Sequence, residues 1–327
     1  MKFIEGEVKW GIIGCGDVCE VKSGPAFSKV DHSSLVAVMR RDVVKAEDFA
    51  RRHGVPRFYG DADQLIADEE VNAIYIATPP VYHEEYAYRA MKAGKPVYIE
   101  KPLTLNSASC ERMITAADRF DVPAVCAHYR RELPLYQEVR KIVEDGRLGN
   151  IRLIDLQLLK TPPEDGMHGA ATNWRVDPEI SGGGLFYDLA PHQLDILCWI
   201  FDKPVEFEGR SLNQARAYDA PDVTYMEALF EKEILLHGLW AFNVGQAAEH
   251  DSCKIVGDRG FMSFPFFMPP TLDVWDHSGS DRKTFTDPEH IQMPMIRTVV
   301  NYFRGSGENP CSLREALVSL QMMDAAG

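Results

Sequence analysis

The chain has 327 residues, of which 45% are hydrophobic and 26% are charged, a composition that is ordinary for a globular protein and a length that suggests two domains. Its 35 basic and 49 acidic residues give a net charge of −14, which argues against binding to the phosphate backbone of nucleic acids. No apolar run approaches the length of a membrane span, and the first residues carry no apolar leader, so we expect a cytoplasmic protein without membrane contact. The seven cysteines include no Cys-x-x-Cys pair, which indicates neither a disulfide framework nor a zinc site.

The first 125 residues alternate short apolar runs with helical stretches, a pattern typical of a doubly wound parallel sheet. The predicted strands are Val8–Ile13, Ser34–Met39, Ala73–Ala77, Pro96–Ile99 and Ala124–Ala127. The predicted helices are Lys45–His53, Tyr82–Ala93 and Asn106–Phe120, with a further one that opens at Pro25 after a short turn.

From about Pro134 the pattern differs: longer strands follow one another without helices between them, except that one long helix separates the first of these strands from the rest. The predicted strands are Ile151–Leu159, Val223–Phe230, Ile234–Ala241 and Ser252–Val256. The predicted helices are Leu135–Asp145, Asp188–Ile200, Met293–Phe303 and Ser312–Asp324. We therefore predict an α/β protein with a dinucleotide-binding Rossmann domain at 1–125. A second α/β domain at 126–327, with an open and mostly antiparallel sheet, would bind substrate and form oligomers, and the cleft between the domains is the expected ligand site.

A glycine loop, Gly14-Cys15-Gly16-Asp17-Val18-Cys19, follows the first predicted strand and precedes a helical segment. Its glycines permit a tight turn and let backbone N–H groups approach a pyrophosphate, so Gly14, Gly16, Asp17 and Val18 are predicted to bind a dinucleotide. Cys19 stands where glycine or alanine is usual for close packing of the helix on the sheet. Taken alone, the loop fits equally well a glycine turn in an unrelated α/β protein.

Arg40 and Arg41 end the second predicted strand, where an NAD site usually has an acid that binds the ribose 2′-hydroxyl. A guanidinium can instead hold a 2′-phosphate through paired charge-assisted hydrogen bonds. The pattern favours NADP over NAD. The alternative is that both arginines are solvated surface charges and that Asp42 serves as the acid.

Glu100-Lys101-Pro102 follows the predicted strand Pro96–Ile99, at the end of the sheet where open α/β folds bind ligands. A lysine in this place can hydrogen-bond a substrate hydroxyl, and its charge favours the alkoxide that forms as hydride leaves. The alternative is an ion pair between Lys101 and a surface carboxylate. The glycine loop upstream favours the catalytic interpretation.

Asp188 and His192 follow the glycine run Gly182-Gly183-Gly184 and lie four residues apart, so they share one face of a helix. A histidine beside a carboxylate suits proton transfer, although a lone histidine on a helix is more often structural. Asp188, His192 and His168 could also be considered as metal ligands. His168 does not stand at a recognisable ligand spacing from the other two, so no metal site is predicted.

The glycine loop, Glu-Lys-Pro and Asp-x-x-x-His, in this order, resemble the Gfo/Idh/MocA oxidoreductase family over most of the chain. The resemblance implies that His192 is the general acid/base, that Lys101 stabilises charge and that Asp188 orients the histidine. It also implies a cis proline at Pro102, and further cofactor contacts by Thr78, Pro79, His83, Glu100, Lys101, Trp174 and Arg175.

The family implies a dehydrogenase or reductase that acts on a CH–OH group of a sugar, sugar derivative or cyclitol with NADP or NAD. Three alternatives remain open: a non-catalytic dinucleotide sensor, a hydrolase or lyase that uses a tightly held nicotinamide for transient oxidation, and a reductase of a linear tetrapyrrole or dihydrodiol. We also expect a homodimer or homotetramer, because Leu235, Leu239 and Phe242 would lie on a face of the second sheet that no helix covers.

Overall fold

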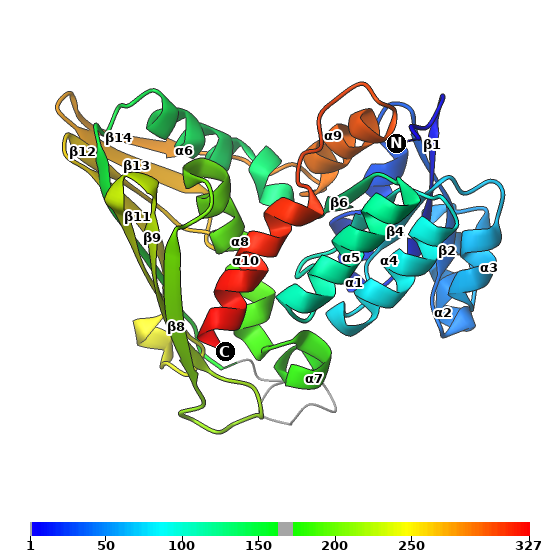
Figure 1. Ribbon diagram of the computed structural model, residues 1–327, viewed down its shortest axis with the longest axis horizontal. Coiled ribbons are helices and arrows are strands. Elements are labelled where there is room, and N and C mark those ends of the chain that lie inside the picture. The colour runs from blue at the N-terminus through cyan, green and yellow to red at the C-terminus, as the bar shows by residue number, and fades with distance from the viewer. Residues whose placement is uncertain (1, 163–172) are drawn as a thin grey trace. The chain divides into compact units, whose positions relative to one another are not determined.

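A computed structural model describes residues 2–162 and 173–327 (Figure 1). The chain forms two units, one of Met1–Tyr129 with Pro288–Leu317 and one of Arg130–Asp287 with Val318–Gly327. The first boundary lies close to the predicted one at 125. The segment Pro288–Leu317 was expected in the second domain, and the structure places it in the first unit instead.

The sheet of the first unit has six parallel strands in the order β3-β2-β1-β4-β5-β6, the strand order of Rossmann folds. The strands are β1 (Val8–Ile13), β2 (Ser33–Met39), β3 (Arg57–Tyr59), β4 (Ala73–Ile76), β5 (Val97–Ile99) and β6 (Ala124–Cys126). Five of them were predicted from their apolar runs. The three residues of β3 were missed because this edge strand is short and none of its residues is buried.

The first unit also contains helices, of which those that precede β6 connect one strand to the next. The helices are α1 (Asp17–Val21), α2 (Val43–His53), α3 (Ala62–Ala67), α4 (His83–Lys92), α5 (Ser107–Phe120) and α9 (Met293–Phe303), with the 3₁₀ turns η1 (Gly24–Ser28) and η2 (Pro80–Tyr82). The Asn106 side chain caps α5 by accepting from the Ser109 N–H at 2.9 Å. Gly54 ends α2 in the left-handed conformation, at φ 65°.

Aromatic packing explains why α9 belongs to the first unit although it lies far along the chain. The ring of Phe303 on α9 lies 5.5 Å from that of Trp10 on β1, and Trp10 also contacts Phe27 of η1 at 4.8 Å. The Ile4 N–H donates to the Phe303 carbonyl at 2.8 Å. All three rings are fully buried, so α9 completes the core on this side of the parallel sheet.

The sheet of the second unit has eight strands in the order β14-β13-β12-β11-β7-β10-β9-β8, and every pairing is antiparallel except that of β7 with β10. The strands are β7 (Ile151–Leu159), β8 (Glu206–Leu212), β9 (Val223–Phe230), β10 (Ile234–Ala241), β11 (His250–Gly257), β12 (Gly260–Phe264), β13 (Thr271–Asp276) and β14 (Gly279–Thr284). The predicted open and mostly antiparallel sheet is confirmed.

Helices cover one face of this second sheet (Figure 1). The helical elements are α6 (Pro134–Glu144), α7 (Pro178–Ser181), α8 (Gly184–Phe201) and the end of α10 (Leu313–Ala326), with the 3₁₀ turns η3 (Tyr129–Glu132), η5 (Trp174–Val176), η6 (Glu231–Glu233) and η7 (Gln246–Ala248). On the other face Leu235 of β10 is 49% exposed and pairs with Leu153 of β7, which is 40% exposed. The prediction for Phe242 was wrong: its side chain is buried, because the residue lies an odd number of positions after Leu235 and strand alternation therefore does not place it on the face of Leu235.

None of the helices described in residues 2–162 and 173–327 is long and apolar enough to cross a membrane.

Candidate active site

The glycine loop turns sharply at Gly14, which has a φ of 92°. A Cβ at Gly14 would lie 2.9 Å from the Thr78 backbone nitrogen, so only glycine fits without displacing the backbone after β4. The N–H groups of Gly14 and Cys15 donate to the Met39 carbonyl at 2.9 and 3.2 Å, which ties the loop to the end of β2. Among the described residues, a Cβ at Gly16 would meet one atom beyond its chain neighbours, 3.9 Å away, so their packing leaves the loop backbone accessible there.

The two loop cysteines are packed rather than reactive. Cys19, at the third motif position, is fully buried, and a Cβ at Gly24 would lie 2.2 Å from the Cys19 carbonyl oxygen. The closest packing behind the loop is therefore made by Gly24, a position that the motif did not indicate. Burial raises the pKa of the Cys19 thiol and raises that of Cys15 to about 11, so both thiols stay protonated at neutral pH.

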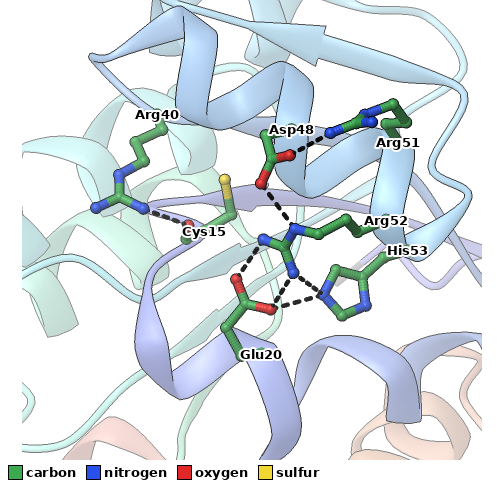
Figure 2. Close-up of polar contacts among 7 residues, drawn as sticks. All are labelled: Cys15, Glu20, Arg40, Asp48, Arg51, Arg52 and His53. Carbon is green, nitrogen blue, oxygen red and sulfur yellow. Dashed lines mark hydrogen bonds and ion pairs between the residues drawn. The ribbon is translucent and has the colours of Figure 1, made fainter.

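Arg40 reaches from the end of β2 to the glycine loop, where its Nη1 donates to the Cys15 carbonyl at 3.4 Å (Figure 2). Arg41 lies over the Tyr82 ring, with its guanidinium 4.9 Å from the ring centroid. Asp42 caps α2 by accepting from the Lys45 N–H at 3.3 Å, and the Lys45 ammonium lies 3.6 Å from the same carboxylate. Arg40 is therefore directed to the glycine loop, whereas the carboxylate of Asp42 is engaged in the cap of α2.

A network of ion pairs joins α1 to α2 below the loop (Figure 2). Arg52 of α2 donates to both carboxylate oxygens of Glu20 on α1 at 2.7 Å, and its Nε donates to Asp48 at 2.7 Å. The hydrogen bonds from Arg52 are the main reason why the pKa of the Glu20 carboxyl is lowered to about 2. The sequence did not predict this ion-pair network between α1 and α2.

Glu100 points into the protein, and Lys101 follows it at the end of β5. The buried carboxylate of Glu100 accepts from the Tyr75 hydroxyl at 2.5 Å and from Gln292 Nε2 at 2.6 Å, both on Oε1. Its Oε2 accepts from the Lys101 N–H at 3.2 Å. The Lys101–Pro102 peptide bond is cis, as the family resemblance implies. The carboxylate of Glu100 thus holds the backbone of the lysine, and its predicted contact with the cofactor stays a prediction.

His83 is fully buried and joins the loop after β4 to the loop that carries Lys101. Its Nε2 lies 2.7 Å from the Thr78 carbonyl oxygen, and its Nδ1 lies 3.1 Å from that of Pro102. Burial lowers the pKa of the imidazole. Thr78 Oγ1 is buried and has no hydrogen-bond partner within the described part of the chain. A polar cofactor bound beside Gly14 would supply the hydrogen-bond partner that this hydroxyl needs. Thr78 and the accessible loop backbone therefore fit a dinucleotide.

Asp188 and His192 lie on α8 in the second unit, as the sequence predicts. The helix begins at Gly184, where φ is 75° and a Cβ would lie 2.5 Å from the Ala220 Cβ, so glycine permits this close approach. Arg175 Nε lies 3.4 Å from the Asp188 carboxylate, and its guanidinium lies 4.7 Å from the centroid of the Trp174 ring. The structure therefore brings together the predicted residues Trp174, Arg175 and Asp188.

Buried polar contacts hold α8 at two residues that follow His192, Gln193 and Asp195. Arg131 forms a two-pronged ion pair with Asp195, at 2.9 and 2.7 Å, and both side chains are 3% exposed. The Trp240 indole N–H donates to Gln193 at 2.6 Å. The His192 ring lies 5.9 Å from the ring of Phe267. The sequence did not predict the pairing of Arg131 with Asp195 or of Trp240 with Gln193, because the partners lie far apart in the chain.

The predicted site residues thus form two groups. The first unit holds the glycine loop, Arg40, Arg41, Thr78, Pro79, His83, Glu100 and Lys101, and the second holds Trp174, Arg175, Asp188 and His192. His168 lies outside the described residues. In the described ranges, no group of three His, Cys, Asp or Glu side chains could hold a metal ion.

A Rossmann sheet, an open glycine loop and a lysine at the end of β5 define the class of protein, a nicotinamide-dependent dehydrogenase or reductase. The sequence matches the oxidoreductase family with an NAD-binding Rossmann fold over residues 8–128 and the GFO/IDH/MocA C-terminal domain over residues 136–263. The chain belongs to the Gfo/Idh/MocA oxidoreductase family, and the predicted resemblance is confirmed.

Several relatives are similar over nearly the whole chain. Oxidoreductase P35 of Formosa agariphila is 42% identical over 323 residues, which cover 98% of both chains. The trans-1,2-dihydrobenzene-1,2-diol dehydrogenase of Xenopus laevis is 27% identical and covers 91% of this chain and 85% of its own. The crystal structure of an aldose-aldose oxidoreductase from Caulobacter crescentus, complexed with glycerol, has the same fold, with a TM-score of 0.86 at 20% identity over 98% of this chain and 96% of its own.

Proposed function

We propose that this oxidoreductase transfers hydride between C4 of a nicotinamide and a secondary hydroxyl or ketone of a sugar, sugar derivative or cyclitol. The observation that carries the proposal is Lys101, whose backbone is held by the buried Glu100 at the end of the sheet where the glycine loop also lies. The names of the relatives, a diol dehydrogenase and an aldose-aldose oxidoreductase, support a substrate with vicinal or multiple hydroxyls.

The bound dinucleotide supplies or accepts hydride at C4, and the protein handles the charge and the proton at the substrate oxygen. The Lys101 ammonium stabilises negative charge on that oxygen as the C–H bond breaks, because a fixed cation favours the alkoxide. His192 takes up the hydroxyl proton in oxidation and returns it in reduction. Asp188, paired with Arg175, orients the histidine or holds a second substrate hydroxyl.

His83 supports this chemistry indirectly. Its ring lies between the backbone carbonyls of Thr78 and Pro102, and because a neutral imidazole has one N–H, a hydrogen bond to one carbonyl and packing against the other hold the Thr78 loop beside the Lys101 loop. The cofactor contacts then come from Thr78 and Pro79 rather than from the imidazole.

The test is a panel of polyols, sugars, ketoses and trans-dihydrodiols assayed with each dinucleotide, followed by variants of Lys101 and His192. A positioned general acid/base contributes roughly 10² to 10⁴ in rate, so His192→Ala should lower kcat by that order and leave dinucleotide affinity nearly unchanged. Lys101→Met should also lower kcat. An active wild-type enzyme with near-normal kcat in both variants would refute the proposed roles.

The same panel separates the alternatives. A hydrolase or lyase with transient oxidation would turn over without net change in cofactor absorbance. A dinucleotide sensor would bind cofactor and show no turnover with any substrate class in the panel.

The second part of the proposal is a preference for NADP over NAD. It is supported by Arg40, which contacts the glycine loop, and by Asp42, which is engaged in the cap of α2. One charge-assisted phosphate contact contributes about 1.5–3 kcal/mol, so Arg40→Asp should weaken NADPH binding roughly ten- to a hundredfold more than NADH binding. Arg51→Asp, at an exposed residue of α2, is the matched control and should leave the ratio unchanged. Equal losses for both cofactors in Arg40→Asp would refute this preference.

A further inference from the structure

Gln292 lies outside both regions that match the family, 8–128 and 136–263, and yet contacts the Glu-Lys-Pro motif. It stands directly before α9 and is 1% exposed. Its Nε2 donates to Glu100 Oε1 at 2.6 Å, and its Oε1 accepts from the Tyr98 hydroxyl at 3.4 Å. Its backbone N–H donates to the Lys22 carbonyl at 3.2 Å, which fixes the residue just beyond the end of α1.

We propose that Gln292 is a positioning residue for hydride transfer, which acts on Lys101 through the carboxylate of Glu100. The proposal rests on the proposed function, in which the Lys101 ammonium stabilises charge on the substrate oxygen. The chain of contacts runs from the Gln292 amide to one oxygen of Glu100, and from the other oxygen to the Lys101 N–H.

The physical basis is the need of a buried carboxylate for donors. An ionised carboxylate in a protein interior is stable only when hydrogen bonds replace its lost hydration. Glu100 is 6% exposed and accepts from Tyr75, Gln292 and the Lys101 backbone. Loss of the Gln292 donor leaves the Tyr75 hydroxyl as the one donor to Oε1 within the described residues, so the carboxylate will turn toward other donors and release or shift the Lys101 backbone.

The first experiment separates positioning from stability. Gln292→Met keeps the length and the unbranched shape of the side chain and removes the amide donor. Misplacing a reacting group by about 1 Å can cost about 10² in rate, so we expect kcat to fall roughly 10- to 100-fold while the KM for the dinucleotide changes little. Val299→Ala, a fully buried apolar residue of the same α9, is the control: it should lower the melting temperature and leave kcat within about twofold. Equal kcat losses in the two variants would refute the proposal.

The second experiment uses pH within one variant. Gln292→Glu places two carboxylates in one site, where they share a single proton because both cannot ionise at this distance. With the proton present, the O–H of the new side chain can donate to Glu100 as the amide does, and without it the two groups repel each other. We expect kcat to approach the wild-type value at the acid end of the profile and to fall to that of Gln292→Met or below as pH rises. A ratio to wild type that is constant with pH would refute the proposal.

The third experiment keeps this proposal distinct from the proposed function. In a Lys101→Met background, Gln292→Met should lower kcat no further, because its effect passes through the lysine. If Lys101→Met lowers kcat and Gln292→Met does not, the positioning role is refuted while the catalytic role of Lys101 stands. If Lys101→Met leaves kcat unchanged, the role of the lysine fails, and the role of Gln292 fails with it.

Discussion

Replacing Arg131 by methionine should destabilise the second unit by several kcal/mol. Arg131 and Asp195 form two hydrogen bonds, at 2.9 and 2.7 Å, and each side chain is only 3% exposed. The substitution removes the guanidinium that offsets the charge of the buried Asp195 carboxylate. Breaking a buried pair in this way costs about 3–5 kcal/mol, a large part of the roughly 5–15 kcal/mol that holds a typical protein folded.

The assay is urea unfolding at pH 7 followed by tryptophan fluorescence. The signal reports mainly on the second unit, because only one of the five tryptophans, Trp10, lies in the first. Lys141→Met is the matched control: this residue pairs with the exposed Asp145 in the same unit, so its replacement should leave the free energy of unfolding nearly unchanged.

The double variant Arg131→Met/Asp195→Met tests the cause. It should recover most of the loss, because no uncompensated charge remains in the interior. A single variant within about 1 kcal/mol of wild type, or a double variant no more stable than the single one, would refute the reasoning.

Three further predictions concern the glycine loop, the ion-pair network between α1 and α2, and the exposed face of the second sheet. Gly14→Ala forces a Cβ to within 2.9 Å of the Thr78 backbone nitrogen at a φ of 92°, so it should cost about 1–3 kcal/mol and weaken dinucleotide binding; unchanged melting and an unchanged Kd would contradict this. Glu20→Gln should lower the free energy of unfolding by about 1 kcal/mol at pH 7, because Arg52 lowers the pKa of the Glu20 carboxyl from 4.5 to about 2. Solvent screens the pair at this partly exposed site, which keeps the loss small. A lowered pKa stabilises the folded state above pH 4.5, and this stabilisation is lost as pH falls toward 2, so the gap in free energy of unfolding between variant and wild type should narrow over that window. If the open sheet face forms a homo-oligomer, Leu235→Lys, at a side chain that is 49% exposed, should lower the mass measured by light scattering; a monomeric wild type would contradict the expected assembly.

Strands with strong side-chain patterns were predictable from the sequence. The bounds of β1, β7, β9 and β10 agree with the predicted ranges, because a continuous apolar run or a strict alternation fixes both the element and its face. Two of the missed strands, β3 and β14, lack that pattern. In β14, whose sequence is Gly-Ser-Asp-Arg-Lys-Thr, nearly every residue is exposed, and pairing with β13 rather than burial makes it a strand.

The candidate site divides in the same way. Motifs local in sequence predicted the glycine loop, the lysine at the end of β5 and the Asp-x-x-x-His helix, because each depends on the conformation of one turn or one helix face. The contacts of Gln292 with Glu100 and of Arg131 with Asp195 could not be predicted in this way. The partners lie 192 and 64 residues apart, and only the folded sheet and helices bring the polar atoms together.

These long-range contacts show a common principle in the two units. In each unit the element that carries a proposed catalytic residue is held by a buried carboxylate, Glu100 beside Lys101 and Asp195 three residues after His192. Apolar side chains of similar volume often hold a core at least as well as a buried ion pair or polar pair, so stability alone does not explain either carboxylate. What a directional hydrogen bond adds is a fixed orientation of the backbone or helix that it contacts. Replacing both Arg131 and Asp195, or both Gln292 and Glu100, by apolar residues should therefore give a folded protein with reduced kcat. This outcome would separate the requirements of the fold from those of the reaction.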